Sequence, residues 1–169
     1  MRKKIKFLLI WVIISEAAFS QQLPIAYRYA NTDLFKNESV VFTENYHPPI
    51  KLPAGTKLFT PSIQDIIQSE QILIEQYNIL MKKEGWQEQK NIKRKYYKYK
   101  RQYIGFLDSK GDKKIIVNLL NFKRCKKPDA NYPNWDSEYL VGFGSYYEKN
   151  TRRYVINLDS RMISLNTFD

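Results

Sequence analysis

The stretch TPSIQDIIQSEQILIEQYNILMKKEG, residues 60–85, decides the fold because it predicts one long amphipathic helix. Its apolar residues recur at intervals of three and four positions, which places them on one side of a helix. They are Ile63, Ile66, Ile67, Leu73, Ile74, Tyr77, Leu80 and Met81. Glutamine and glutamate residues fill the opposite side. We therefore expect a helix over about residues 61–84, with its apolar side buried against another element.

The ends of this helix carry capping signals. Two alternatives are open at the N-terminus: Thr60 caps the helix with Pro61 at its first position, or Ser62 and Asp65 form a capping box. The two lysines at residues 82–83 suit the negative end of the helix dipole. Both ends of the expected helix are therefore marked in the sequence.

The chain after Trp86 predicts strands. Residues 92–107 alternate aromatic and basic side chains, and residues 108–112 have the composition of a hairpin turn. Further strands are expected over residues 113–122, 139–147, 152–158 and 162–168, with a loop over residues 123–137.

These elements predict a single α+β domain over residues 61–169. In it, one long amphipathic helix packs on a curled antiparallel sheet of about four to five strands, a shape that cystatin-like and NTF2-like sheets have by analogy. Residues 21–60 predict an irregular N-terminal segment. It contains a short apolar strand at residues 40–42 and a proline-rich loop at residues 47–53, because prolines are excluded from central strands.

The first twenty residues have the composition of a secretory signal peptide. Basic residues precede the unbroken apolar run Phe7–Ile14, and Ala18 and Ser20 are small residues at the −3 and −1 positions of a cleavage site. The apolar run is much shorter than the roughly 20 residues that span a bilayer. We therefore expect cleavage of residues 1–20 and a periplasmic or secreted product. An uncleaved N-terminal anchor is the alternative.

The chain has one cysteine, Cys125, far from that cleavage site. A bacterial lipoprotein needs a cysteine directly after the cleavage site, so we expect a product that is not a lipoprotein. A single cysteine cannot form an intramolecular disulfide either. The hydrophobic core must therefore hold the fold together.

The chain is basic, with a formal net charge of +11. Without residues 1–20 it has 24 basic and 16 acidic residues, a net charge of +8. Such an excess favours attraction to anionic glycans, lipopolysaccharide or membrane surfaces, although an AT-rich codon composition produces the same excess. Nucleic acid is not an expected partner of an exported protein.

The sequence lacks the motifs of the common enzyme classes. The one histidine, His47, and the one cysteine, Cys125, are too few for a zinc site. No phosphate-binding loop, nucleophile elbow or metalloprotease motif occurs. We therefore expect no metal or cofactor and favour a non-enzymatic protein. Paired carboxylates stay open as an alternative, because only geometry identifies them.

The sharpest compositional feature is the tract at residues 90–103, where basic residues are interleaved with aromatic ones. Such a mixture can hold a polyanion. The candidate ligand-binding residues are Arg101, Gln102, Tyr103 and Trp135. In a strand, Arg101 and Tyr103 share one face and Gln102 lies on the other. A half-buried strand with one solvated basic face therefore predicts the same pattern.

The C-terminal half, about residues 99–169, also carries a recognisable pattern. YKRQYIG at residues 99–105, IIVN at residues 115–118, Trp135 and a closing aromatic hairpin resemble a loosely defined set of small exported proteins of Bacteroidota. The resemblance implies export and an antiparallel sheet, and it implies no activity.

The leading hypothesis is a non-enzymatic binding module of the periplasm or cell exterior. Its concave sheet face or the loop at residues 123–137 would bind a glycan, a peptide or another envelope protein. The alternatives are a small secreted hydrolase with carboxylate chemistry and an electrostatic binder of anionic envelope glycans.

Overall fold

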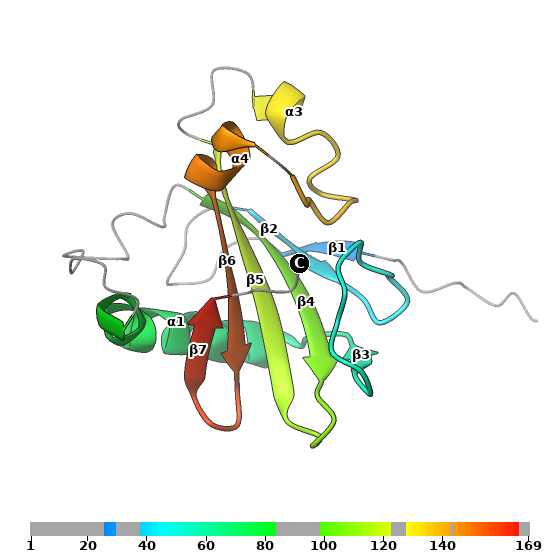
Figure 1. The fold of residues 1–169 in the computed structure, drawn as a ribbon. Coiled ribbons are helices and arrows are strands. Elements are labelled where there is room, and N and C mark those ends of the chain that lie inside the picture. Colours follow the sequence, from blue (N-terminus) through cyan, green and yellow to red (C-terminus); the bar gives the residue numbers. More distant parts are fainter. Residues whose placement is uncertain (1–25, 30–37, 84–98, 123–127, 143, 166–169) are drawn as a thin grey trace, which may run out of the picture.

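A curled sheet with one long helix against one of its faces forms the fold (Figure 1). The structure, a computed structural model, describes residues 26–29, 38–83, 99–122, 128–142 and 144–165. The elements are β1 (Ala26–Tyr29), β2 (Ser39–Phe42), β3 (Lys57–Phe59), α1 (Ile63–Lys83), β4 (Tyr99–Leu107), β5 (Lys113–Asn121), α3 (Pro128–Asn131), α4 (Ser145–Asn150), β6 (Thr151–Asn157) and β7 (Met162–Leu165). The predicted α+β class is confirmed.

The strands form one sheet in the order β1-β2-β4-β5-β6-β7, and β3 pairs with β4 as well. β2 runs beside residues 101–104 of β4, and β3 runs beside residues 105–107. The β2–β4 pair is parallel, whereas the other described pairs are antiparallel. This parallel pair corrects the expectation of a purely antiparallel sheet. Its physical reason is the long crossover through α1, which returns the chain to β4 in the direction of β2.

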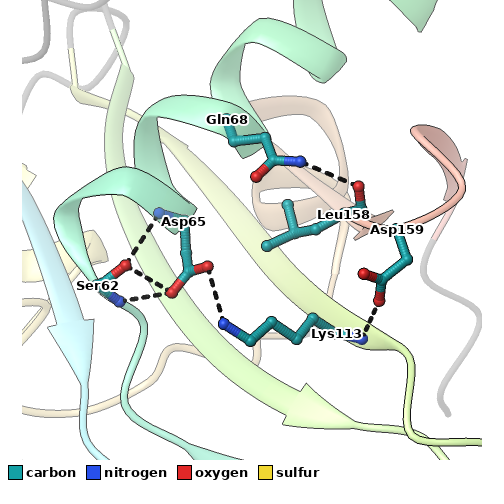
Figure 2. A network of polar contacts seen from close by, with 6 residues as sticks. All are labelled: Ser62, Asp65, Gln68, Lys113, Leu158 and Asp159. Atoms are coloured by element: carbon teal, nitrogen blue, oxygen red, sulfur yellow. Dashed lines mark hydrogen bonds and ion pairs between the residues drawn. The ribbon is translucent and has the colours of Figure 1, made fainter.

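The capping box is the alternative that forms at the start of α1 (Figure 2). The Asp65 N–H donates to Ser62 Oγ at 3.2 Å, and the Ser62 N–H donates to Asp65 Oδ2 at 2.9 Å. Thr60 is engaged elsewhere, since its Oγ1 accepts a hydrogen bond from the Glu44 N–H at 3.1 Å. The predicted helix is therefore confirmed, with Ser62 rather than Thr60 as its N-cap.

One face of the sheet packs against α1, which crosses behind β5 and β6 in Figure 1. The buried residues of this helix-side core are Val41, Ile66, Ile72, Leu73, Tyr77, Leu80, Met81, Tyr99, Tyr103, Ile115, Val117, Leu119, Tyr154, Ile156 and Leu158. Ile63 was expected on the buried stripe, but it is 52% exposed. Ile63 is the first residue of α1, and the first buried residue of this helix is Ile66.

The opposite face of the sheet is covered by irregular chain and short helices. Its buried residues are Val40, Phe42, Ile104, Phe106, Ile116, Leu120, Tyr132, Trp135, Tyr139 and Val155. We call this side the loop face. α3 and α4 lie together at one end of the sheet in Figure 1. The sheet is therefore buried on both faces, and β4 and β5 are buried almost throughout, including polar residues such as Arg101 and Asn118.

The strand predicted over residues 139–147 is wrong. Residues 139–142 form no strand, and Ser145–Asn150 form helix α4. The N–H groups of Tyr139 and Leu140 donate to side chains, Tyr46 Oη at 2.8 Å and Gln102 Oε1 at 3.0 Å, instead of to a neighbouring strand. Tyr139 and Tyr147 pack against the loop face instead.

Other expectations are refined. β3 forms within the segment expected to be irregular, and the proline-rich stretch before it lacks strand structure as predicted. Residues 1–20, Cys125 and residues 90–98 of the basic tract lie outside the described residues. Within the described part of the chain, no helix is both long and apolar enough to cross a bilayer.

Candidate functional site

The four residues selected from the sequence lie in the interior, on both sides of the sheet. Arg101, Gln102 and Tyr103 are fully buried in β4, and Trp135 is 8% exposed. The alternation of the strand sends Arg101 and Tyr103 to the helix side, and it sends Gln102 to the loop face beside Trp135. The structure therefore brings these residues together as two separate pairs.

The helix-side pair meets a residue that the sequence analysis missed, Glu70 of α1. Glu70 is fully buried, its Oε1 lies 3.2 Å from Arg101 Nε, and it also accepts a hydrogen bond from the Tyr103 hydroxyl. Burial raises the pKa of Tyr103 well above its usual value, although the charge of Arg101 opposes that rise. The signal was present in the sequence, because Glu70 stands between Ile66 and Leu73 in the apolar stripe. A carboxylate in that stripe requires a buried partner.

The loop-face pair is a hydrogen-bonded junction centred on Gln102. Its Nε2 donates to the carbonyl oxygens of Trp135 at 2.6 Å and Glu138 at 2.7 Å. Its Oε1 accepts from Asn118 Nδ2 and from the Leu140 N–H, both at 3.0 Å. Gln102 therefore uses its full hydrogen-bonding capacity to attach the segment at residues 135–140 to the sheet.

A third polar network joins the start of α1 to the strand ends below it (Figure 2). Lys113 Nζ lies 3.3 Å from Asp65 Oδ1, and the Lys113 N–H donates to Asp159 Oδ2 at 2.7 Å. Gln68 Nε2 donates to the Leu158 carbonyl at 3.0 Å. Burial opposes ionisation of Asp65, but the hydrogen bonds from Ser62 and the charge of Lys113 outweigh it and lower the Asp65 pKa. These contacts position the helix on the sheet.

An open groove lies on the loop face near the tip of the β4–β5 hairpin. Its volume is about 430 Å³, within the range of small-ligand pockets. The lining residues are Pro53, Phe106, Asp108, Ser109, Lys114, Val155, Ser164 and Leu165. Phe106 and Val155 are apolar and almost fully buried, whereas Pro53, Ser109 and Ser164 are exposed. The groove thus has an apolar floor and a more polar rim.

The hairpin turn at the rim is well ordered by its own hydrogen bonds. Asp108 Oδ1 accepts from the N–H groups of Lys110 at 2.9 Å and Asp112 at 3.0 Å. Its Oδ2 lies 2.8 Å from Lys114 Nζ, and the hydrogen bond from Lys114 is the main reason why the Asp108 pKa falls to about 2. Gly111 has a φ of +90°, a conformation that favours glycine. The predicted turn is confirmed, and it fixes one wall of the groove.

The described residues give little support for catalytic chemistry. Nowhere in the described ranges do three or more His, Cys, Asp or Glu residues gather as a metal site would require. His47 is exposed, and its Nδ1 lies 3.2 Å from the Asn45 carbonyl oxygen. Among the described lining residues of the groove, Asp108 is the single carboxylate, and it is paired with Lys114.

Comparisons of the chain with protein-family models, with curated proteins and with solved structures found no match. The functional interpretation therefore rests on the residues and their geometry.

Proposed function

We propose that this protein is an exported, non-enzymatic binding module of the periplasm or cell exterior, and that the groove on its loop face is the ligand site. The observation that carries the proposal is the groove itself, an opening of about 430 Å³ with an apolar floor and a polar rim. Ligand sites are commonly concave, mainly apolar and furnished with a few polar groups. The four candidate residues chosen from the sequence are buried and do not line this groove.

The construction of the groove supports a preformed site. Its walls come from the turn before β3, the β4–β5 hairpin and the β6–β7 hairpin, three parts of the chain that lie far apart in the sequence. The Asp108–Lys114 ion pair and the backbone hydrogen bonds of the hairpin hold one wall in place. A ligand would therefore meet a surface that needs little ordering, which favours affinity.

Export is part of this proposal and rests on the sequence. Residues 1–20 have the three regions of a signal peptide, and the residue directly after the expected cleavage site is Gln21 and not a cysteine. The native host is separated into cytoplasm, periplasm and medium, and the intact mass of the protein is measured in each fraction. We expect a chain that begins at Gln21, in the periplasm or medium. A full-length chain in the cytoplasm would contradict the proposal.

The experiment for the binding site is a screen of immobilised glycans and peptides with the wild type and two variants. Ser164→Trp places a large ring in the groove, and Ser145→Trp makes the same change at an exposed position in α4, outside the groove. We expect a ligand that binds the wild type and Ser145→Trp but not Ser164→Trp. Equal binding by both variants would show that the groove is not the site.

Electrostatic attachment to anionic envelope glycans is a second candidate. Lys57 is exposed at the edge beside Leu107, and Lys110 is exposed at the adjacent turn, whereas the neighbouring Lys113 is paired with Asp65. Binding of this kind falls steeply as salt screens the charges. The two candidates are distinguished by repeating the screen at several salt concentrations, because binding in an apolar groove is much less sensitive to salt.

The hydrolase alternative receives no support from the groove. Hydrolysis by paired carboxylates needs two acidic side chains on either side of the scissile bond. The described groove residues include Asp108 alone, and its pKa of about 2 makes it a poor general acid.

A further inference from the structure

Arg153 of β6 lies on the loop face, next to the floor of the groove. It stands two residues before Val155, so the same face of the strand carries both side chains. Two residues of a strand span roughly 6.6 Å. The Arg153 guanidinium carbon lies 5.5 Å from the centre of the Tyr139 ring, which covers this part of the face. Arg153 is therefore not a lining residue of the groove but lies one pleat along the strand from Val155, on the side toward Tyr139.

Arg153 differs from Arg101 and Arg161 in its charge compensation, and it differs from Arg152, whose guanidinium donates to the carbonyl oxygens of Glu148 and Thr151. Arg101 contacts Glu70, and Arg161 contacts Glu75 at 2.7 Å. No acidic side chain of the described residues pairs with Arg153. The Arg153 side chain is partly buried, and its Nε is buried without a hydrogen-bond acceptor from the described chain. The buried Nε therefore has an unused donor, which an acceptor on a ligand could satisfy.

The neighbours of Arg153 add further polar capacity. Asn118 of β5 is its direct partner in the sheet register, and Asn118 Oδ1 is buried without a hydrogen-bond partner among the described residues. The Tyr139 hydroxyl is likewise buried without a hydrogen-bond partner among the described residues. Burial raises the pKa of Tyr139, although the charge of Arg153 opposes that rise. Of these two neighbours, only the Tyr139 hydroxyl can donate a hydrogen bond to an anion, because Asn118 Oδ1 is an acceptor.

The basic residue inside the groove is not equivalent to Arg153. Lys114 Nζ lies 2.8 Å from Asp108 Oδ2, so its charge is already balanced. An anionic group on a ligand therefore gains more at Arg153 than at Lys114. Because Arg153 supplies a single positive charge in a planar fork, a carboxylate matches it in charge and shape.

We propose that the groove binds an amphiphilic carboxylate, whose apolar chain lies over Phe106 and Val155 and whose carboxylate pairs with Arg153. This inference rests on the proposed function, because it assigns a ligand class to the same groove. It narrows that function to a carrier or sensor of a molecule with one apolar chain and one carboxylate.

The test uses two probes of equal chain length, decanoate and 1-decanol, with the purified protein in isothermal titration calorimetry. We expect decanoate to bind the wild type roughly ten- to a hundredfold more tightly than decanol, as one charge-assisted contact implies. The difference should shrink with added salt. Equal affinities for the two probes, or no binding of decanoate, would overturn the carboxylate inference.

Variants then separate the anchor from the groove. Arg153→Gln should remove the advantage of decanoate and leave the affinity for decanol unchanged. Ser164→Trp should weaken both probes, because it fills the groove. If Arg153→Gln does not fold, Arg153→Lys serves instead, and it should reduce the advantage because lysine lacks the planar fork. Unchanged decanoate binding in a folded Arg153 variant would refute the proposed pairing of Arg153 with the carboxylate.

Failure of this inference and failure of the proposed function have different signatures. If decanoate and decanol bind equally and Ser164→Trp blocks both, the groove is a ligand site and the carboxylate anchor is wrong. If a glycan or peptide from the screen requires the groove while neither probe binds, the proposed function holds and the ligand class is wrong.

Discussion

Replacing Gln102 by methionine tests whether this residue serves the interior of the protein or a ligand. Methionine has a similar length and no hydrogen-bonding groups comparable to an amide. In the structure Gln102 makes four hydrogen bonds, to Trp135, Glu138, Asn118 and Leu140. All four would be lost in Gln102→Met.

The size of the expected loss follows from the two bonds that are buried. These join Gln102 to the Trp135 carbonyl oxygen and to the Asn118 amide. A buried polar group left without a partner costs about 1–3 kcal/mol. Two such groups predict a loss of about 2–6 kcal/mol in the free energy of unfolding, a large part of the ~5–15 kcal/mol typical of a domain.

The assay is equilibrium urea unfolding, together with amide hydrogen exchange over residues 135–140. Gln64→Met is the matched control, because Gln64 is exposed on α1 and the chemical change is the same. We expect the control to change stability by less than about 0.5 kcal/mol. Faster exchange should be concentrated in residues 135–140 of Gln102→Met. A loss no larger than that of the control, with unchanged exchange, would refute the reasoning and return Gln102 to the candidate ligand residues.

Three further predictions concern the helix side, the hairpin and the loop face. Glu70→Leu should lower the free energy of unfolding by about 3–5 kcal/mol, because it leaves the buried Arg101 without that carboxylate, and adding Arg101→Met should restore most of the loss in the same urea assay. The pKa of Asp108 is about 2 in the folded protein, below its ordinary value of 3.8, so its contribution to stability is complete above pH 3.8 and is lost as the pH falls through about 2. NMR titration of the Asp108 carboxyl should give a midpoint near 2, and a midpoint near 3.8 would contradict the predicted shift. Gly142→Ala should lower the melting temperature, because a Cβ at this position would lie 2.3 Å from the Tyr147 ring; an unchanged melting temperature would show that the ring moves aside at no cost.

In the proposed function, the ligand binds on the loop face of the sheet and not on the helix side. The helix side is closed by α1 and by the Glu70–Arg101 contact. The loop face has the groove, the neighbouring Arg153 and a covering segment attached through Gln102. A ligand therefore has access to the sheet on the side where the cover is irregular chain, and loops are where binding sites commonly occur.

The elements that depend on near neighbours in the chain were predictable from the sequence. The spacing of apolar residues defines α1, and Ser62 and Asp65 cap it from within one turn. The turn at Asp108 is equally local, because Gly111 tolerates a positive φ and Asp108 binds N–H groups two and four residues ahead. The period of two along β4 likewise assigns Arg101 and Gln102 to opposite faces of the sheet, because neighbouring side chains in a strand point in opposite directions.

The tertiary structure decided the features that join distant segments. The parallel β2–β4 pair depends on how the crossover through α1 returns, and residues 139–142 lose their strand because Tyr46 and Gln102 capture their N–H groups. Composition marked the basic and aromatic residues of β4 as candidate ligand contacts. Only packing shows that Arg101 is buried against Glu70, 31 positions away, because charge pairing depends on distance in space and not on distance along the chain. For the same reason the groove, whose walls come from three separate parts of the chain, could not be predicted from the sequence.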